Sequence, residues 1–157
     1  MFPKLEVNAV FVTPIDSSET QGNIDNCVIT VLDAYMWRNW MPFLESHGSD
    51  GGSPVHVSVR LRLDNSNGRA TKLSFSAIVL GEDNRAYPVI FPVVSDEHQN
   101  VWDGNLARGD NKIVEMLAQE GPYLRVGSKA SVELIFINQF DVKASVKTPD
   151  LIIDRAD

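Results

Sequence analysis

The stretch that decides the fold is residues 55–63, which read Val55-His56-Val57-Ser58-Val59-Arg60-Leu61-Arg62-Leu63. Every odd position is apolar and every even position is polar, the period of two expected of a β-strand with one face in the core and one in water. A cluster of turn-forming residues follows at 64–68, and residues 72–80 continue as a second strand pattern. With residues 85–89 as a return partner after the turn at 81–84, the pattern predicts two successive antiparallel hairpins.

Further segments have strand patterns. Residues 5–11 alternate, residues 27–32 form a β-branched run that is apolar on both faces, and residues 130–137 place apolar side chains on one face. A weaker strand is predicted within residues 142–153, where Pro149 indicates an edge or a bulge. The sequence therefore predicts a mostly β fold, specifically an immunoglobulin-like antiparallel β-sandwich of about seven strands, with a barrel as the alternative.

One short helix is predicted after Asp110, a residue type that caps helix N-termini. The segment is residues 111–120, and Gly121-Pro122 ends it. The side chains near one stripe of this helix are those of Ile113, Met116, Leu117 and Glu120. We expect a crossover packed on the sandwich. The chain of 157 residues shows no internal repeat, and its linker-like stretch at 46–53 is short, so residues 1–157 are predicted to form a single domain.

Composition and charge argue against several classes of protein. With 14 basic and 21 acidic residues the net charge is -7, which argues against binding nucleic acid or an anionic membrane, because both require basic surface. No apolar run approaches the length that a membrane span needs, so no membrane insertion is expected. The single cysteine, Cys27, cannot form an internal disulfide. That fits a reducing compartment, and residues 1–8 show no signal peptide pattern. At face value the sequence predicts a cytoplasmic protein, and an envelope or secreted one if a signal sequence has been removed, so the localisation stays open.

The order of elements between Val55 and Pro88 has a family counterpart. It consists of an alternating strand ending in Asn65, a second strand at 73–80, an acidic turn at 82–84, then Arg85 and Tyr87. This pattern resembles the telokin-like extracellular domains, a bacterial immunoglobulin-like family. Residues 127–129, Gly-Ser-Lys, resemble the small turn ahead of that family's late strand. The resemblance implies a sandwich used for recognition or as an accessory to another protein, and it implies no active site.

Residues 35–44 are unusually rich in large side chains and read Tyr35-Met36-Trp37-Arg38-Asn39-Trp40-Met41-Pro42-Phe43-Leu44. Aromatic residues, Met and Arg are enriched in protein-binding hot spots. One interpretation is therefore a protein-binding or sugar-stacking surface, with Tyr35, Trp37, Arg38 and Trp40 as the anchors. The other is a short helical turn over the open end of the sandwich, in which Trp37, Trp40 and Met41 face inward at helical spacing.

A second candidate site lies in residues 95–103, which read Ser-Asp-Glu-His-Gln-Asn-Val-Trp-Asp. Carboxylate and imidazole groups can hold a divalent metal, so Asp96, His98, Trp102 and Asp103 are predicted to form a carbohydrate- or metal-dependent ligand site in the alternative reading. The spacing matches neither an EF-hand loop nor a zinc motif, and a polar surface loop explains the same residues.

Nucleophilic catalysis has no recognisable pattern in the chain. No Gly-x-Ser-x-Gly elbow occurs, and Cys27 falls in a segment predicted to be buried, where a thiol is usually inert. A hydrolase using His98 is the third hypothesis. The sequence thus predicts a non-catalytic interaction or accessory module without a cofactor, whose partner is another protein. A homodimer built on residues 35–40 or on an exposed edge strand is a subsidiary expectation.

Overall fold

The computed structural model describes residues 20–39 and 52–156. Those residues form eleven strands and no helix. The strands are β1 (Gln21–Ile24), β2 (Cys27–Asn39), β3 (His56–Asp64), β4 (Thr71–Gly81), β5 (Ala86–Val89), β6 (Val93–Asp96), β7 (Asn105–Leu106), β8 (Asn111–Ala118), β9 (Lys129–Asn138), β10 (Lys143–Lys147) and β11 (Leu151–Ala156). The mostly β prediction is confirmed, with more strands than the seven or so expected because short ones such as β7 carry no periodic pattern. The strand predicted at 5–11 lies outside the described residues.

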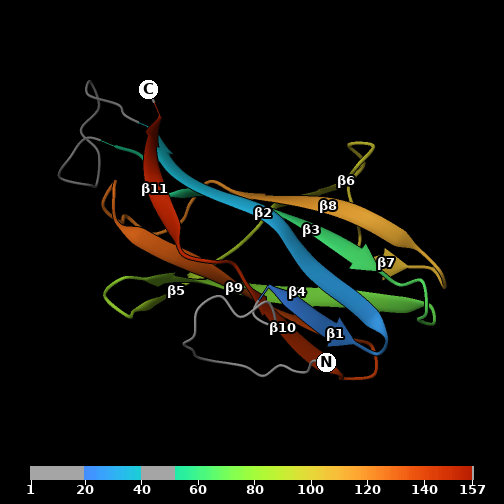
Figure 1. The fold of residues 1–157 in the computed structure, drawn as a ribbon. Coiled ribbons are helices and arrows are strands. Elements are labelled where there is room, and N and C mark those ends of the chain that lie inside the picture. The colour runs from blue at the N-terminus through green and yellow to red at the C-terminus, as the bar shows by residue number, and fades with distance from the viewer. Residues whose placement is uncertain (1–19, 40–51, 157) are drawn as a thin grey trace.

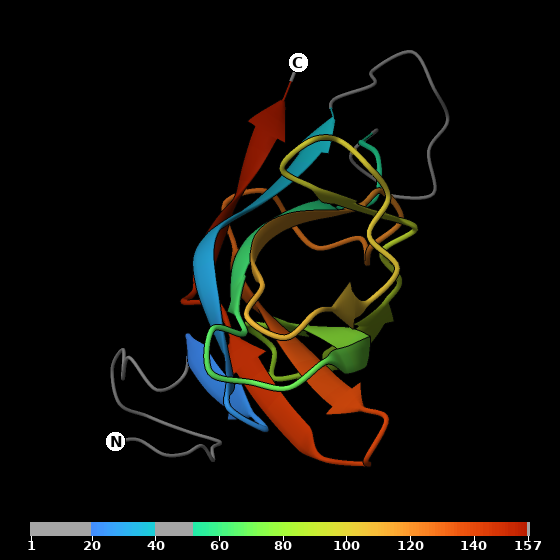
Figure 2. The same cartoon turned by 90° about the vertical axis from the view of Figure 1, so that its right-hand side faces the viewer.

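The strands form one open, curled sheet in the order β5-β4-β9-β11-β2-β3-β8-β6, with β1 on β2, β10 on β9 and β7 on β4. Figure 1 shows β2, β3 and β8 in one half of the sheet and β4, β5, β9 and β10 in the other half, facing it. Strand β11 joins the halves. It pairs antiparallel with β9 through Leu151 and Ile152, and parallel with β2 from Ile153 to Ala156. Figure 2 shows the resulting curl around the interior.

The core fills the space between the two halves. The apolar positions of β3 at Val57, Val59, Leu61 and Leu63 are all fully buried, so the alternation in residues 55–63 predicted the inward face correctly. From the other half, β9 contributes Val132, Leu134 and Phe136. The rings of Phe75 and Phe136 pack with their centroids 5.7 Å apart. Burial of this kind contributes roughly 1.5–3 kcal/mol per large apolar side chain, so the inward faces supply most of the stabilisation.

One of the two predicted hairpins is present. Strands β4 and β5 pair antiparallel from Ala77–Val89 to Leu80–Ala86, as predicted. Strands β3 and β4 do not pair, and the prediction of a first hairpin was wrong. β3 lies between β2 and β8, whereas β4 lies between β9 and β5. The turn residues at 65–70 instead carry the chain between the two halves, and the buried Asn65 amide Nδ2 holds that crossing by donating to the carbonyls of Arg69 and Ala107, 3.0 Å each.

The helix predicted at 111–120 is also a correction, because residues 111–118 form the strand β8. Val114, Met116 and Ala118 are buried, and Ile113, Glu115 and Leu117 alternate with them on the other face. The segment pairs with β3 along its whole length, from Val57–Ala118 to Asp64–Asn111. Helix propensity is a weak prior, and a long ladder that satisfies the backbone groups of a buried strand overrides it.

Both end strands of the sheet are blocked against further pairing. Gly81 at the end of β4 donates its N–H to the Arg85 carbonyl just before β5. Because backbone groups in an antiparallel pair alternate between pointing toward the partner and away from it, the backbone nitrogen of Pro88 points away from β4. Proline has no N–H, so this position offers no donor to a further strand. At the other end, the Val94 carbonyl of β6 accepts the Trp102 N–H at 3.0 Å. Asp96 N–H donates to the Asn100 carbonyl at 2.8 Å. The two ends therefore offer little backbone for edge-to-edge association.

Candidate functional site

Strand β2 continues through Asn39, so residues 35–39 are extended and the helical turn predicted there was wrong for these residues. Extended backbone sends alternate side chains to opposite faces. Tyr35 is 60% exposed, whereas Met36 is buried. Trp37 is half-buried on the same side of β2 as Tyr35, where its ring packs against His56 with the centroids 5.4 Å apart and the planes tilted by 36°. Trp40, the fourth predicted anchor, lies outside the described residues.

Arg38 points inward and is buried. Its Nε donates to the Ser53 carbonyl at 2.6 Å, and its Nη1 donates to the Leu124 carbonyl at 3.1 Å. The guanidinium carbon lies 5.5 Å from the centroid of the Tyr123 ring. Arg38 therefore links β2 to two loops. The structure brings Tyr35 and Trp37 to one surface but places Arg38, predicted as an anchor beside them, on the opposite face of the strand.

The side chains beside Tyr35 on the outer face follow from the strand register. Tyr35 is opposite Ser58 on β3, Ser58 is opposite Leu117 on β8, and Leu117 is opposite Val93 on β6. Val93 is 51% exposed, and Leu117 is half-buried. Side chains directly opposite one another share a face and lie close together. This row crosses four adjacent strands.

A second row, next to this one on the same face, runs from Asp33 on β2 through Arg60 on β3 to Ser95 on β6. Arg60 forms an ion pair with Asp33 through both Nε at 3.0 Å and Nη2 at 2.6 Å. Ser95 continues this row on β6 and bridges to Val101, whose side chain is 87% exposed. We call the exposed or half-exposed apolar side chains of the two rows the outer face; they are Tyr35, Val93, Val101 and Leu117.

The carboxylates predicted to bind metal or sugar are engaged within their own loop. Asp96 Oδ1 accepts the N–H of His98 at 2.9 Å and of Asn100 at 3.0 Å. Asp103 accepts the backbone and side-chain N–H groups of Asn105. The Asn100 and Asn105 backbone N–H groups, respectively, are the main reason that the pKa of each carboxyl lies below its ordinary value. These hydrogen bonds hold the backbone of the two turns, and Asp is common in loops because its side chain can accept such bonds from nearby backbone N–H groups.

Trp102 is a core residue, not a stacking platform. Its side chain is only 9% exposed, and its indole Nε1 donates to the Asn105 carbonyl at 2.9 Å. His98 is exposed on the loop surface. Within residues 20–39 and 52–156, no three His, Cys, Asp or Glu side chains come together in a group that could hold a metal ion. The structure therefore does not assemble the four predicted residues into one site.

Cys27 lies in the core at the start of β2 and is fully buried. Burial, and to a lesser degree the charge of Asp64, raises the pKa of the thiol to about 12. A thiol that stays protonated at neutral pH is a poor nucleophile.

In the described part of the chain, no helix is long and apolar enough to cross a bilayer.

A shallow groove of about 350 Å³ lies where β5 leads into β6, close to the end of β8. Its lining residues are Pro88, Ile90, Pro92, Gln119 and Glu120. Ile90 is 81% exposed and gives the groove an apolar wall. Among the described residues that line the groove, Glu120 carries the one charged group.

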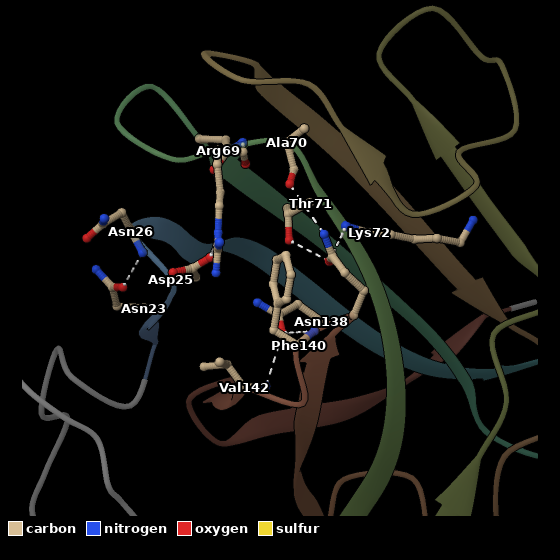
Figure 3. A network of polar contacts seen from close by, with 12 residues as sticks. Asn23, Asp25, Asn26, Arg69, Ala70, Thr71, Lys72, Asn138, Phe140 and Val142 are labelled. Atoms are coloured by element: carbon tan, nitrogen blue, oxygen red, sulfur yellow. Dashed lines mark hydrogen bonds and ion pairs between the residues drawn. The ribbon is translucent and has the colours of Figure 1, made fainter.

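Sequence reasoning missed a cluster at the end of the molecule where several turns meet (Figure 3). Arg69 contacts Asp25 from the β1–β2 turn and Phe140 from the β9–β10 turn. The only signal that could have singled out Phe140 is a large aromatic side chain in a short polar turn, where hydrophilic residues are usual.

Comparison with known proteins assigns the chain to no family. No protein-family model matches it, and no curated protein matches it.

Proposed function

We propose that the chain is an immunoglobulin-like β-sandwich that acts as a non-catalytic interaction or accessory module and binds another protein through its outer face. Support for the sandwich comes from the two facing halves of the sheet and from β11, which is shared between them. The resemblance of residues 55–88 to telokin-like domains points in the same direction. A fold alone does not define a function, so the proposal depends on the surface.

The observation that carries the proposal is the continuous row from Tyr35 to Val93. At a strand spacing of about 4.8 Å, four strands separate its two ends by about 14 Å. Val101 extends the face by one more segment. Exposed apolar side chains that gather on one face, with a tyrosine among them, mark protein-binding surfaces. The ends of the sheet are blocked by Pro88 and by residues 100–102, so the face is the more accessible surface for a partner.

The alternative ligand-binding function has no observation in its favour. Asp96 and Asp103 are used to shape turns, and Trp102 packs in the core. We therefore do not propose a second function.

Cross-linking tests the proposal directly. A benzophenone amino acid in place of Tyr35 should capture a partner protein from a native lysate upon irradiation, because Tyr35 is more than half exposed on the face. The same group in place of Ile152, which is 49% exposed on β11, is the matched control. The partner captured at Tyr35 should no longer bind the unlabelled double variant Tyr35→Ser with Val93→Ser.

Stability measurements separate binding from folding in this experiment. Replacing two exposed side chains should change the free energy of unfolding by no more than about 1 kcal/mol. Retention of the same partner by the double variant, or equal capture at Tyr35 and Ile152, would contradict the outer face as the binding surface.

A further inference from the structure

The second surface of interest lies at the end of the molecule where the β1–β2, β3–β4 and β9–β10 turns meet (Figure 3). Arg69 is exposed, with 57% of its side chain accessible. Its Nε donates to Asp25 Oδ2 at 2.7 Å, and its guanidinium carbon lies 3.8 Å from the centroid of the Phe140 ring. The planar group is thus held on one face by an aromatic ring and along one edge by a carboxylate.

The ion pair of Arg69 differs from that of Arg60 in how much of the guanidinium it uses. Arg60 binds Asp33 through Nε and Nη2 together. Arg69 binds Asp25 through Nε alone, and neither of its Nη atoms donates to any acceptor in the described part of the chain. Among residues 20–39 and 52–156, the four N–H groups of the Nη1 and Nη2 edge thus have no acceptor, and the side chain is 57% exposed. A guanidinium edge of this shape matches the two oxygens of a carboxylate.

The turns beneath Arg69 are held by side-chain hydrogen bonds, so its position is set before any ligand arrives. Asn138 Oδ1 accepts the N–H groups of Phe140 and Val142 at 2.9 and 3.0 Å. The Gln139 side chain bonds the next loop, since its Oε1 accepts from the Lys72 N–H at 2.9 Å. A preorganised site loses less entropy on binding than a mobile one.

Apolar surface adjoins the open guanidinium edge. Phe140 is 48% exposed and Val142 is 39% exposed, and Figure 3 shows both in the turn below Arg69. We define Arg69, Phe140 and Val142 as the loop-end site. It combines an arginine and an aromatic side chain, two residue types enriched where proteins bind one another.

We propose that the loop-end site binds a segment of a partner protein in which an Asp or Glu side chain is flanked by apolar residues. The carboxylate accepts hydrogen bonds from Nη1 and Nη2 of Arg69, and the apolar neighbour packs on Phe140 and Val142. Asp25 already offsets part of the positive charge of Arg69, so recognition depends on the geometry of the guanidinium edge more than on net charge. The site uses no residue of the outer face, and either surface can fail without the other.

A peptide titration followed by NMR tests this site. The full chain, labelled with ¹⁵N, is titrated with acetyl-Leu-Asp-Leu-amide and, separately, with acetyl-Leu-Asn-Leu-amide at millimolar concentration. The Asp peptide should shift the amide signals of Ala70, Phe140 and Val142, and the Asn peptide should bind at least about tenfold more weakly, because it lacks the second oxygen and the charge. Arg69→Gln should reduce the affinity for the Asp peptide to that of the Asn peptide.

Two further variants make the test specific. Arg69→Lys keeps the charge but loses the planar edge, and should weaken binding several-fold. Arg85→Gln removes the same charge from a side chain that is 78% exposed outside the loop-end site, and should leave binding unchanged. If Arg69→Gln does not fold, as judged from its spectrum, Arg69→Lys carries the test. Absence of shifts, equal binding of the two peptides, or binding that persists in the Arg69 variants would overturn the proposal.

Discussion

Because Arg38 is buried, we expect its substitution to lower stability, whereas substitution of a surface anchor would weaken partner binding. Replacing Arg38 with alanine removes, among other contacts, the hydrogen bonds from its charged guanidinium to the Ser53 and Leu124 carbonyls. Each such bond contributes roughly 1.5–3 kcal/mol, and a buried carbonyl left without a donor is itself unfavourable. We therefore expect Arg38→Ala to lower the free energy of unfolding by about 3–5 kcal/mol.

A loss of that size is measurable because a domain has a total stability of about 5–15 kcal/mol. Urea unfolding followed by tryptophan fluorescence gives the free energy, and an unchanged slope with urea shows that the folded and unfolded states remain comparable. Arg38→Lys should fall between wild type and Arg38→Ala, because one ammonium group cannot reproduce the two-directional donation of the guanidinium.

The control is Arg85→Ala, since Arg85 is exposed and its ion pair with Asp83 is 3.9 Å long. Surface pairs of this kind contribute about 0–1 kcal/mol, so little change is expected. If Arg38→Ala changes stability by less than about 1 kcal/mol and abolishes partner binding, Arg38 acts at the surface and the reasoning from its burial is refuted.

Three further changes test other parts of the fold. Burial raises the pKa of Cys27 from 9.0 to about 12, so iodoacetamide at pH 8 should modify the thiol only after unfolding in urea, and rapid labelling of the native chain would contradict this. The stability that the neutral thiol contributes is full below pH 9.0 and lost as pH rises toward 12, a fall that Cys27→Ser should reduce. Pro88→Thr should restore an outward N–H on β5 and cause concentration-dependent self-association, measured by sedimentation. Asn65→Asp should lower the free energy of unfolding by roughly 2–4 kcal/mol because a buried carboxylate replaces the amide donor to two carbonyls, whereas Asn67→Asp on the exposed turn should not.

The two candidate surfaces show which of their residues a local sequence pattern could predict and which it could not. The richness of residues 35–40 in large side chains singled out the strand that carries Tyr35 and Trp37. It did not predict that Arg38 points inward, because the direction of each side chain depends on whether these residues form a strand or a helical turn, and composition does not decide between the two. Val93 and Leu117 join Tyr35 only through the register of β2, β3, β8 and β6. The loop-end site requires a contact between Arg69 and Asp25, which are 44 residues apart.

The same distinction explains the corrections to the fold. Residues 111–118 suit a helix or a strand, and pairing with β3 decided the outcome. The turn-forming residues after β3 correctly predicted a reversal of the chain, but the strand that follows pairs in the other half of the sheet. A turn directs the chain locally, whereas the choice of partner strand depends on burial and hydrogen bonding over the whole domain.

The sequence by itself determined that the protein is mostly β and which side chains of β3 and β9 enter the core. A period of two is a property of consecutive residues, so it can be read without knowing what lies opposite. Tertiary structure alone decided that β3 pairs with β2 and β8 instead of β4, that residues 111–118 form a strand, and which side chains gather in the outer face and the loop-end site. Those features consist of contacts between distant segments, and the free energy that selects them comes from burying both halves of the sheet together.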